Sequence, residues 1–352
     1  MRYTETLLDD IRSQIEPDDV VVKEAKDRRR LVQDAATSYG HTRQTFPSGS
    51  LAHGTAICPI HRRDKGLDAD CAVVLDPAKW PYLGPETSAN EPPDATVEPF
   101  RAHVERHIRR NGYPKAKVTV TKRAVLVEFK APLPEGEDPS VDLIVALPRT
   151  PNGVWIPNTE QHRWDPSDPE RHTELFLGPD SAKDLRVMRA RVVRLAKAEN
   201  KRTDPPALCS FNIEALAIMF LTEVLPLDFA LRRLWAAGAD DLSRRLTPDP
   251  AWVSGPIKVK DRLAASARWH DNAVRLTKAI NGSAYPESVR ETLQPLWPDY
   301  VPDSGGGSRA REQASYASAL RAGRPVYAAP AGGLSLAATG AAIKQPRSFG
   351  SD

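Results

Sequence analysis

The hydrophobic pattern of the first half of the chain alternates between helical and strand spacing. Apolar residues at helical spacing predict helices over residues 3–15, 18–39 and 97–111. Alternating apolar residues predict strands over residues 68–76, 117–130 and 140–147, the middle segment folding as an antiparallel pair. Strands and helices mixed in this order predict an α+β domain with a mixed or antiparallel sheet.

From residue 181 the pattern becomes wholly helical. Its periodicity predicts helices over residues 181–201, 209–225, 228–246 and 258–281. Beyond them the sequence is rich in Ala, Gly and Ser, and it cannot bury enough apolar surface to offset the entropy lost on ordering. We therefore expect three parts: an α+β domain with N-terminal helices over residues 1–178, a C-terminal helical lobe over 179–301, and a flexible basic tail over 302–352.

Composition narrows the class of protein. The chain is 40% hydrophobic and 27% charged, as in ordinary globular proteins. The N-terminus begins with charged residues, and acids interrupt the longest apolar stretch, so we expect a cytoplasmic protein without membrane contact. Three widely spaced cysteines form neither a disulfide framework nor a zinc ribbon.

The net charge of +3 comes entirely from residues 302–352, which hold six basic and three acidic residues. The remaining 301 residues carry equal numbers of basic and acidic side chains. A balanced surface has no broad positive field for a nucleic-acid duplex, so nucleic-acid binding is not supported. Any anion site must therefore be local.

The candidate chemistry begins at the segment Gly49–Thr55, followed by Asp68 and Asp70 at the start of a predicted strand. Residues two apart on a strand share a face, so these two carboxylates lie side by side. Asp142, inside another apolar strand, joins them if the strands are neighbours. Carboxylates about 4 Å apart repel by roughly 4 kcal/mol at an effective dielectric of 20, so they bind a cation or one of them stays protonated.

Carboxylate oxygens on a rigid sheet suit Mg²⁺, with Mn²⁺ as an alternative ion, and two such ions can clamp a phosphoryl transfer. Gly49 lets the backbone approach phosphates, and the Ser50 hydroxyl can donate to them. Thr55 stands where a Walker A loop requires Lys. A lone Asp-x-Asp pair or Gly-Ser turn is typical of ordinary loops, but their combination with a buried acid at Asp142 favours nucleotidyl transfer.

At these residues the chain resembles the DNA polymerase β-like nucleotidyltransferase superfamily, and within it the bacterial cyclic GMP-AMP synthase-like enzymes, the CD-NTases. The resemblance covers about residues 40–225. It lies in the segments Gly49–Ile57, Asp68–Leu75, Val141–Ala146 and Trp164–His172, and in the later motifs RLAKAEN and CSFNIEALA. It implies a polymerase β-like core over residues 1–178, with the active site in a cleft between this core and the helical lobe.

The resemblance also implies residue roles. Those residues are Asp68, Asp70 and Asp142 for catalysis and metal binding, Gly49 and Ser50 for the triphosphate, and Lys197 and Ser210 for phosphates held from the helical lobe. Lys197 also shares one helical face with Arg194 and Lys201, which on their own indicate a solvated face. Ser210 has a second interpretation, as the N-cap of its helix.

By this resemblance, the enzyme joins nucleoside triphosphates such as ATP and GTP into a cyclic oligonucleotide second messenger and releases pyrophosphate. The messenger activates a downstream effector in anti-phage defence (CBASS), and the basic tail suits a handle for a regulatory protein. Two alternatives stay open: transfer of nucleotides to an RNA 3′ end or a protein, and nucleotide binding without turnover. His53, His61, His162 and His172 lack metal-ligand spacing and are expected to be structural or exposed.

Overall fold

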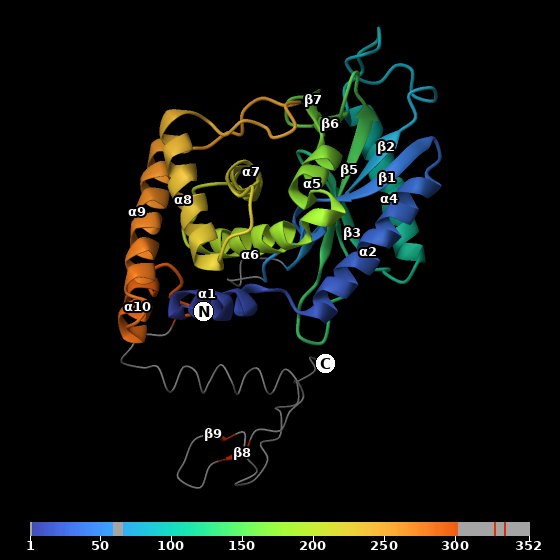
Figure 1. The fold of residues 1–352 in the computed structure, drawn as a ribbon. Helices are drawn as coiled ribbons and strands as arrows, with labels where there is room; N and C mark the ends of the chain where they lie inside the picture. Colours follow the sequence, from blue (N-terminus) through green and yellow to red (C-terminus); the bar gives the residue numbers. More distant parts are fainter. Residues whose placement is uncertain (1, 59–65, 302–326, 329–333, 336–352) are drawn as a thin grey trace.

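The computed structural model describes residues 2–58, 66–301, 327–328 and 334–335. A sheet covered by helices lies beside a lobe made of helices alone (Figure 1). The predicted flexible tail, residues 302–352, lies outside the described residues except for two short paired strands, β8 (Tyr327–Ala328) and β9 (Leu334–Ser335). His61 also lies outside them.

The sheet is mixed, which confirms the predicted α+β class. Its central path runs in the order β1 (Thr42–Ser48), β2 (Asp68–Leu75), β5 (Ser140–Pro148), β4 (Val125–Glu128), β3 (Lys117–Val120). Strands β2 and β5 pair in parallel, and the other neighbours on this path pair antiparallel. A hairpin of β6 (Val154–Asn158) and β7 (Arg163–Ser167) extends from the end of β5.

The two faces of the sheet are covered differently because side chains alternate along each strand. Cys71, Val73 and Leu75 of β2 are buried on the face covered by α2 (Asp19–Ser38) and α4 (Asp94–Arg110). Ala72 and Val74 pack on the other face. Asp68 and Asp70 share the parity of Ala72 and Val74, so alternation places both acids on the face turned away from α2 and α4.

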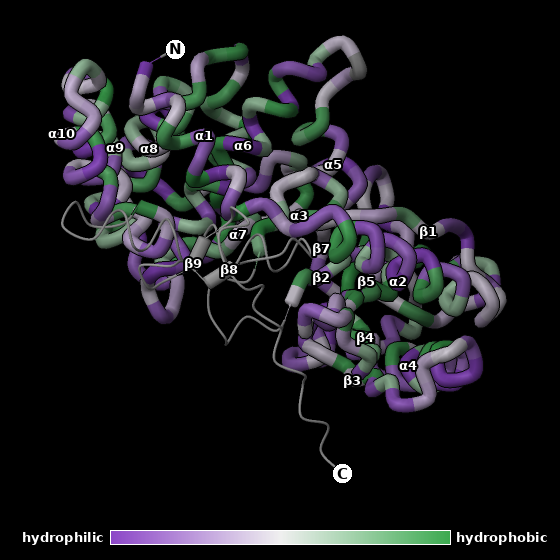
Figure 2. The backbone as a smooth tube through the Cα atoms, turned by 90° about the horizontal axis from the view of Figure 1, so that it is seen from below, coloured by the Kyte–Doolittle hydropathy of each residue, from purple (hydrophilic) through white to green (hydrophobic). Residues whose placement is uncertain are grey.

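The helical lobe is built around α7 (Ser210–Phe220), which is seen end-on in Figure 1. Two helices of the lobe pack against it, α6 (Lys183–Asn200) and α8 (Leu227–Arg244). Beyond them, α9 (Arg262–Asn281) packs on α8, and α10 (Pro286–Leu293) packs on α9. Figure 2 shows the outer helices mixing hydrophilic and hydrophobic residues, as expected of helices with one buried face. The N-terminal helix α1 (Tyr3–Ile15) buries its apolar residues in the same core.

Three short helices lie between the sheet and the helical lobe. They are α3 (Gly49–His53), α5 (Pro169–Leu177) and the 3₁₀ turn η1 (Asp180–Ala182). The loop between α8 and α9, residues 245–261, returns from the helical lobe toward the sheet (Figure 1). There Asp249 accepts a hydrogen bond from His172 of α5. Within the part of the chain that the structure describes, every helix is too short or too polar to cross a lipid bilayer.

Close packing of α8 against α9 predicts that a larger side chain at Gly238 destabilises the fold. A Cβ at this position would lie 2.4 Å from a ring carbon of buried Trp269. We expect Gly238→Ala to destabilise the protein by about 1 to 3 kcal/mol, because the indole ring must move in a filled core. Gly255→Ala is the matched control, since a Cβ there meets nothing within 4 Å. Equal melting temperatures for the two variants would contradict this packing.

Candidate active site

Two carboxylates face each other across the parallel strands β2 and β5. The register places Asp70 opposite Asp142, and Asp68 opposite Ser140. Parallel pairing keeps side chains of the same parity on one face, so the acids of both strands project together. Asp68 differs from the other two because it is exposed and because Ser140 Oγ donates a hydrogen bond to its Oδ1.

The turn after β1 brings its backbone against the same carboxylates. Ser48 is the register partner of Asp70, and Gly49 follows it with a φ of +69°. A Cβ on Gly49 would lie 1.9 Å from Asp70 Oδ2. Glycine is therefore required at this position for two reasons, its left-handed backbone and its contact with Asp70. The sequence analysis expected a turn here, and the structure shows the five-residue helix α3.

A cavity of about 400 Å³ lies over these acids, between the sheet and the helical lobe. This volume is typical of a pocket for a small ligand. All seven residues named from the sequence line it: Gly49, Ser50, Asp68, Asp70, Asp142, Lys197 and Ser210. The first five come from the sheet side, and the last two come from α6 and α7. The structure thus brings the predicted residues together, while their roles stay predictions.

The paired acids lie where ionisation of a carboxyl group is unfavourable. Burial raises the pKa of Asp70 to about 7, and repulsion from Asp142 and Asp68 adds to the effect. Burial, with repulsion from Asp68, raises the pKa of Asp142 to about 6. Asp142 Oδ1 is buried without a hydrogen-bond partner. Buried carboxylate oxygens that lack donors are suited to a cation.

These oxygens fit a divalent metal that also takes ligands from a substrate. Asp70 and Asp142 would hold it from β2 and β5, with Asp68 beside them. Among the described residues, however, no three acidic, histidine or cysteine side chains are placed to hold a metal by themselves. Asp68 lines the same cavity but lies beside the facing pair, with one of its oxygens bonded to Ser140. Mg²⁺ commonly uses one or two carboxylates and completes its coordination with water and phosphate oxygens.

Lys197 lies in the cavity wall within a buried ion pair. Its Nζ donates to Glu214 Oε1 at 2.6 Å and to Thr55 Oγ1 at 3.0 Å, and the residue is 3% exposed. Burial alone would raise the pKa of Glu214, but the Lys197 ammonium and a hydrogen bond from His53 hold it well below its usual range. Lys197 is therefore not a free cation on a solvated face.

His53 and Glu214 line the cavity together with Lys197, and neither was predicted as a site residue from the sequence. His53 Nδ1 lies 2.9 Å from Glu214 Oε2, and its Nε2 lies 3.0 Å from Thr173 Oγ1. These contacts join α3 and α5 to α7, so the network ties the sheet side to the helical lobe. The available signal was Glu214 itself, a lone acid inside an apolar helix.

His172 and Ser210 also line the cavity. His172, predicted to be structural or exposed, is buried, packs against Phe211 in a tilted arrangement with ring centroids 4.7 Å apart, and bonds to Asp249. Ser210 is the first residue of α7, whose N-cap is Cys209 without a side-chain cap bond. The alternative interpretation of Ser210 as the N-cap is therefore wrong, and Ser210 lines the cavity.

Comparison with known proteins assigns the chain to a family. Residues 2–177, half of the chain, match the family model described as the Second Messenger Oligonucleotide or Dinucleotide Synthetase domain (SMODS). The chain belongs to this family. The match contains Gly49, Ser50 and the three aspartates of the cavity, Asp68, Asp70 and Asp142. A family of oligonucleotide synthetases supports nucleotidyltransferase activity for this SMODS protein.

Solved structures of CD-NTases have the same fold. CdnG of Bradyrhizobium diazoefficiens, solved with GTP, is 16% identical and has a TM-score of 0.61, covering 85% of this chain and 96% of its own. CdnC of Escherichia coli MS115-1, solved with ATP, is 17% identical at a TM-score of 0.58, covering 86% and 99%. Apo DncV of Vibrio cholerae is 14% identical at 0.55, covering 86% and 88%.

These identities are low, so the likeness shows the shared fold alone. A search of curated protein sequences finds no match. The fold nevertheless agrees with the polymerase β-like architecture that the sequence predicts, including a core with a helical lobe beside it.

The contact of Gly49 with Asp70 can be tested by comparing Gly49→Ala with Gly54→Ala. Gly49 and Gly54 have the same φ of +69°, but a Cβ at Gly54 meets nothing within 4 Å. Each alanine variant incurs about 1 to 3 kcal/mol of backbone strain. Only Gly49→Ala also displaces Asp70, so we expect it to abolish the thermal stabilisation by ATP and Mg²⁺ that Gly54→Ala retains. Equal ATP-dependent shifts in melting temperature would contradict this geometry.

The raised pKa of Asp70 predicts how stability depends on pH without divalent cations. Unfolded Asp70 loses its proton near 3.8, whereas the folded protein keeps it up to about pH 7. The folded state therefore binds more protons in this window, and stability falls as pH rises through it. Asp70→Asn removes this contribution, so its melting temperature should fall less between these pH values than that of the wild type.

Melting curves measured in a chelator test this expectation. Asp76→Asn is the control, because Asp76 lies just beyond the opposite end of β2 and caps the turn through Ala78 N at 3.0 Å. It should keep the pH slope of the wild type. An identical slope for Asp70→Asn would show that Asp70 is not the titrating group.

Proposed function

We propose that this SMODS protein is a Mg²⁺-dependent synthase that joins nucleoside triphosphates into a cyclic oligonucleotide second messenger. The observation that carries the proposal is the opposition of Asp70 and Asp142 in one cavity, with Gly49 in contact with Asp70. Such a pair of carboxylates beside a glycine turn is suited to metal-bound phosphates. The family match, to synthetases of oligonucleotide messengers, supports the same reaction.

The reaction needs one hydroxyl and one α-phosphate in the cavity. The hydroxyl oxygen of one nucleotide attacks the α-phosphorus of another, the bond to the β-phosphate oxygen breaks, and pyrophosphate leaves. A second, intramolecular displacement of the same kind closes the ring. Bound Mg²⁺ supplies Lewis-acid stabilisation of the phosphate charge.

The residues of the chain have separate tasks in this scheme. Gly49 and Ser50 hold the triphosphate, the Gly49 backbone by close approach and Ser50 through its hydroxyl. Asp142 accepts the proton of the attacking hydroxyl. Asp70 and Asp142, with Asp68 beside them, would hold the metal. Ser210 and Lys197 contact phosphates from the helical lobe, with Lys197 held in place by Glu214.

The cellular role is a further part of the proposal. We propose that the product activates a separate effector in anti-phage defence (CBASS) in the cytoplasm. CdnC, a structural neighbour, has been solved in complex with a HORMA protein. This precedent supports regulation by a partner protein, for which residues 302–352 are the proposed handle.

Product analysis tests the proposed reaction. Purified protein is incubated with Mg²⁺ and the four ribonucleoside triphosphates, treated with phosphatase, and its products are identified by mass spectrometry. We expect phosphatase-resistant cyclic oligonucleotides, and a loss of at least about 100-fold in Asp70→Asn, since a metal ligand is removed. Asp76→Asn, at the other end of the same strand, should retain wild-type synthesis.

Other products identify the alternative functions. Parallel reactions contain labelled nucleotide with an RNA primer or with bacterial proteins as acceptors. Label on RNA ends or on protein, without cyclic products, would replace the proposal by transfer to those acceptors. Nucleotide binding without any product, even with a protein partner added, would indicate a binding module.

A further inference from the structure

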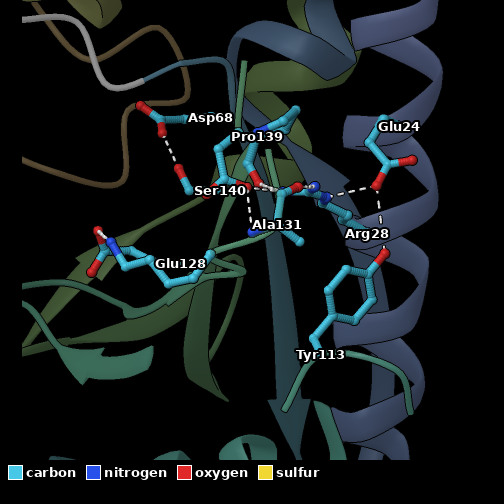
Figure 3. A network of polar contacts seen from close by, with 10 residues as sticks. Glu24, Arg28, Asp68, Tyr113, Glu128, Ala131, Pro139 and Ser140 are labelled. Atoms are coloured by element: carbon cyan, nitrogen blue, oxygen red, sulfur yellow. Dashed lines mark hydrogen bonds and ion pairs between the residues drawn. The ribbon is translucent and has the colours of Figure 1, made fainter. Parts of the chain in front are cut away.

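Asp68 is held by a contact that its two partner acids lack. Asp70 and Asp142 face each other in the register, whereas Asp68 faces Ser140 and accepts a hydrogen bond from its hydroxyl (Figure 3). The Ser140 backbone N–H also donates to Leu67 O at 3.1 Å, just before Asp68. Ser140 is 8% exposed, so its hydroxyl has little freedom to turn to water. The orientation of the Asp68 carboxylate therefore depends on the position of Ser140.

The position of Ser140 depends in turn on a buried arginine of α2. Arg28 Nη1 donates to Pro139 O at 2.7 Å, next to Ser140 (Figure 3). It also donates to Asp138 Oδ1 at 2.6 Å, one residue earlier. Its Nη2 donates to Ala131 O, at the other end of the segment that joins β4 to β5. One guanidinium therefore clamps both ends of this segment.

Arg28 is itself fixed on every side. It is 2% exposed, and its Nε donates to Glu24 Oε1 at 2.8 Å. The guanidinium carbon lies 4.7 Å from the ring centroid of Phe129 and 5.6 Å from that of Tyr113. Arginine presents its donors in a rigid planar fork, which lysine cannot reproduce. The clamp is a built feature of the fold, since a buried charge of this kind is retained only when its donors are satisfied.

The chain that enters β2 lies against the same segment. Gly66 has a φ of +111°, and a Cβ there would lie 3.2 Å from Asp138 O. Residues 66–68 and 138–140 therefore run in close contact, so a shift of one moves the other. Arg28 does not line the cavity. Its effect on the cavity is therefore indirect, and Ser140 is the residue next to the clamped Pro139 whose hydroxyl bonds to a cavity carboxylate.

We propose that Ser140 is a positioning residue that orients the Asp68 carboxylate for a divalent cation, and that Arg28 positions Ser140. The proposal rests on the proposed function, because it assigns Asp68 to the metal site of the synthase. The hydroxyl engages Asp68 Oδ1 and lets the carboxylate turn its other oxygen toward the cation. Without this contact, Asp68 samples several rotamers in solvent, and metal binding must restrict them.

Mn²⁺ binding tests the proposal without relying on catalysis. Mn²⁺ is titrated by electron paramagnetic resonance into the full chain with a non-hydrolysable ATP analogue, and the Mg²⁺ concentration for half-maximal synthesis is measured in parallel. We expect Ser140→Ala to weaken Mn²⁺ binding by about 10-fold, as for other residues that orient metal ligands. Ser140→Thr keeps a hydroxyl and should recover most of the affinity.

A matched control separates this effect from a loss of stability. Ser266→Ala removes another hydroxyl that is 8% exposed, from the helical lobe, where it donates to Ala239 O at 2.7 Å. It should lower the melting temperature to a similar degree and leave Mn²⁺ binding unchanged. Arg28→Lys should weaken Mn²⁺ binding in the same direction as Ser140→Ala. Because Arg28 acts through Ser140, the double variant should bind no more weakly than Ser140→Ala alone.

Each outcome decides between the inference and the function on which it rests. Unchanged or tighter Mn²⁺ binding in Ser140→Ala would overturn the inference, the second result showing that Ser140 holds Asp68 away from the metal. A double variant that sums the two single effects would remove Arg28 from the account. If the wild type binds Mn²⁺ but makes no product, the proposed synthase activity fails while the positioning role stands. If the wild type binds no Mn²⁺, both fail.

Discussion

Asp70 and Asp142 lie opposite each other because β2 and β5 pair in parallel with a register that leaves no freedom to separate them. A shift of one residue would turn one acid to the face packed by α2 and α4. Burial and repulsion among the acids raise the pKa of both carboxyl groups, and Asp142 Oδ1 has no hydrogen-bond donor. A cation bound between the two acids would relieve this repulsion.

The helical lobe places a lysine in the cavity wall beside these acids, but that lysine is paired with a glutamate. Lys197 points from α6 toward the cavity, but Glu214 neutralises it at 2.6 Å, and His53 binds the other oxygen of the same carboxylate. A lysine held this way has one position, so under the proposed function its Nζ is already placed for a phosphate. The same network joins the sheet side to α6 and α7. Cavity shape and lobe arrangement are thus coupled through buried polar contacts.

Local pattern predicted the elements from which the site is built. A lone acid, Asp142, inside an apolar strand suggested that this strand pairs with the one that carries Asp68 and Asp70. The register confirms that these strands, β5 and β2, are adjacent. The hairpin of β6 and β7 was not predicted, because Pro157 and Pro166 interrupt the alternating pattern of a strand. Helix α7 ends at Phe220, five residues before the predicted 225, in a segment that leads to Pro226. Glu214 as the partner of Lys197 was unpredictable, because their contact depends on how two helices pack.

Crystals grown with Mn²⁺ and a non-hydrolysable ATP analogue test the central claim most directly, because manganese can be located by its anomalous scattering. The account predicts manganese between Asp70 and Asp142, with the triphosphate against Gly49 and Ser50 and one Asp68 oxygen turned toward the metal. Manganese bound elsewhere, or a triphosphate outside the cavity with the two acids sharing a proton, would contradict it.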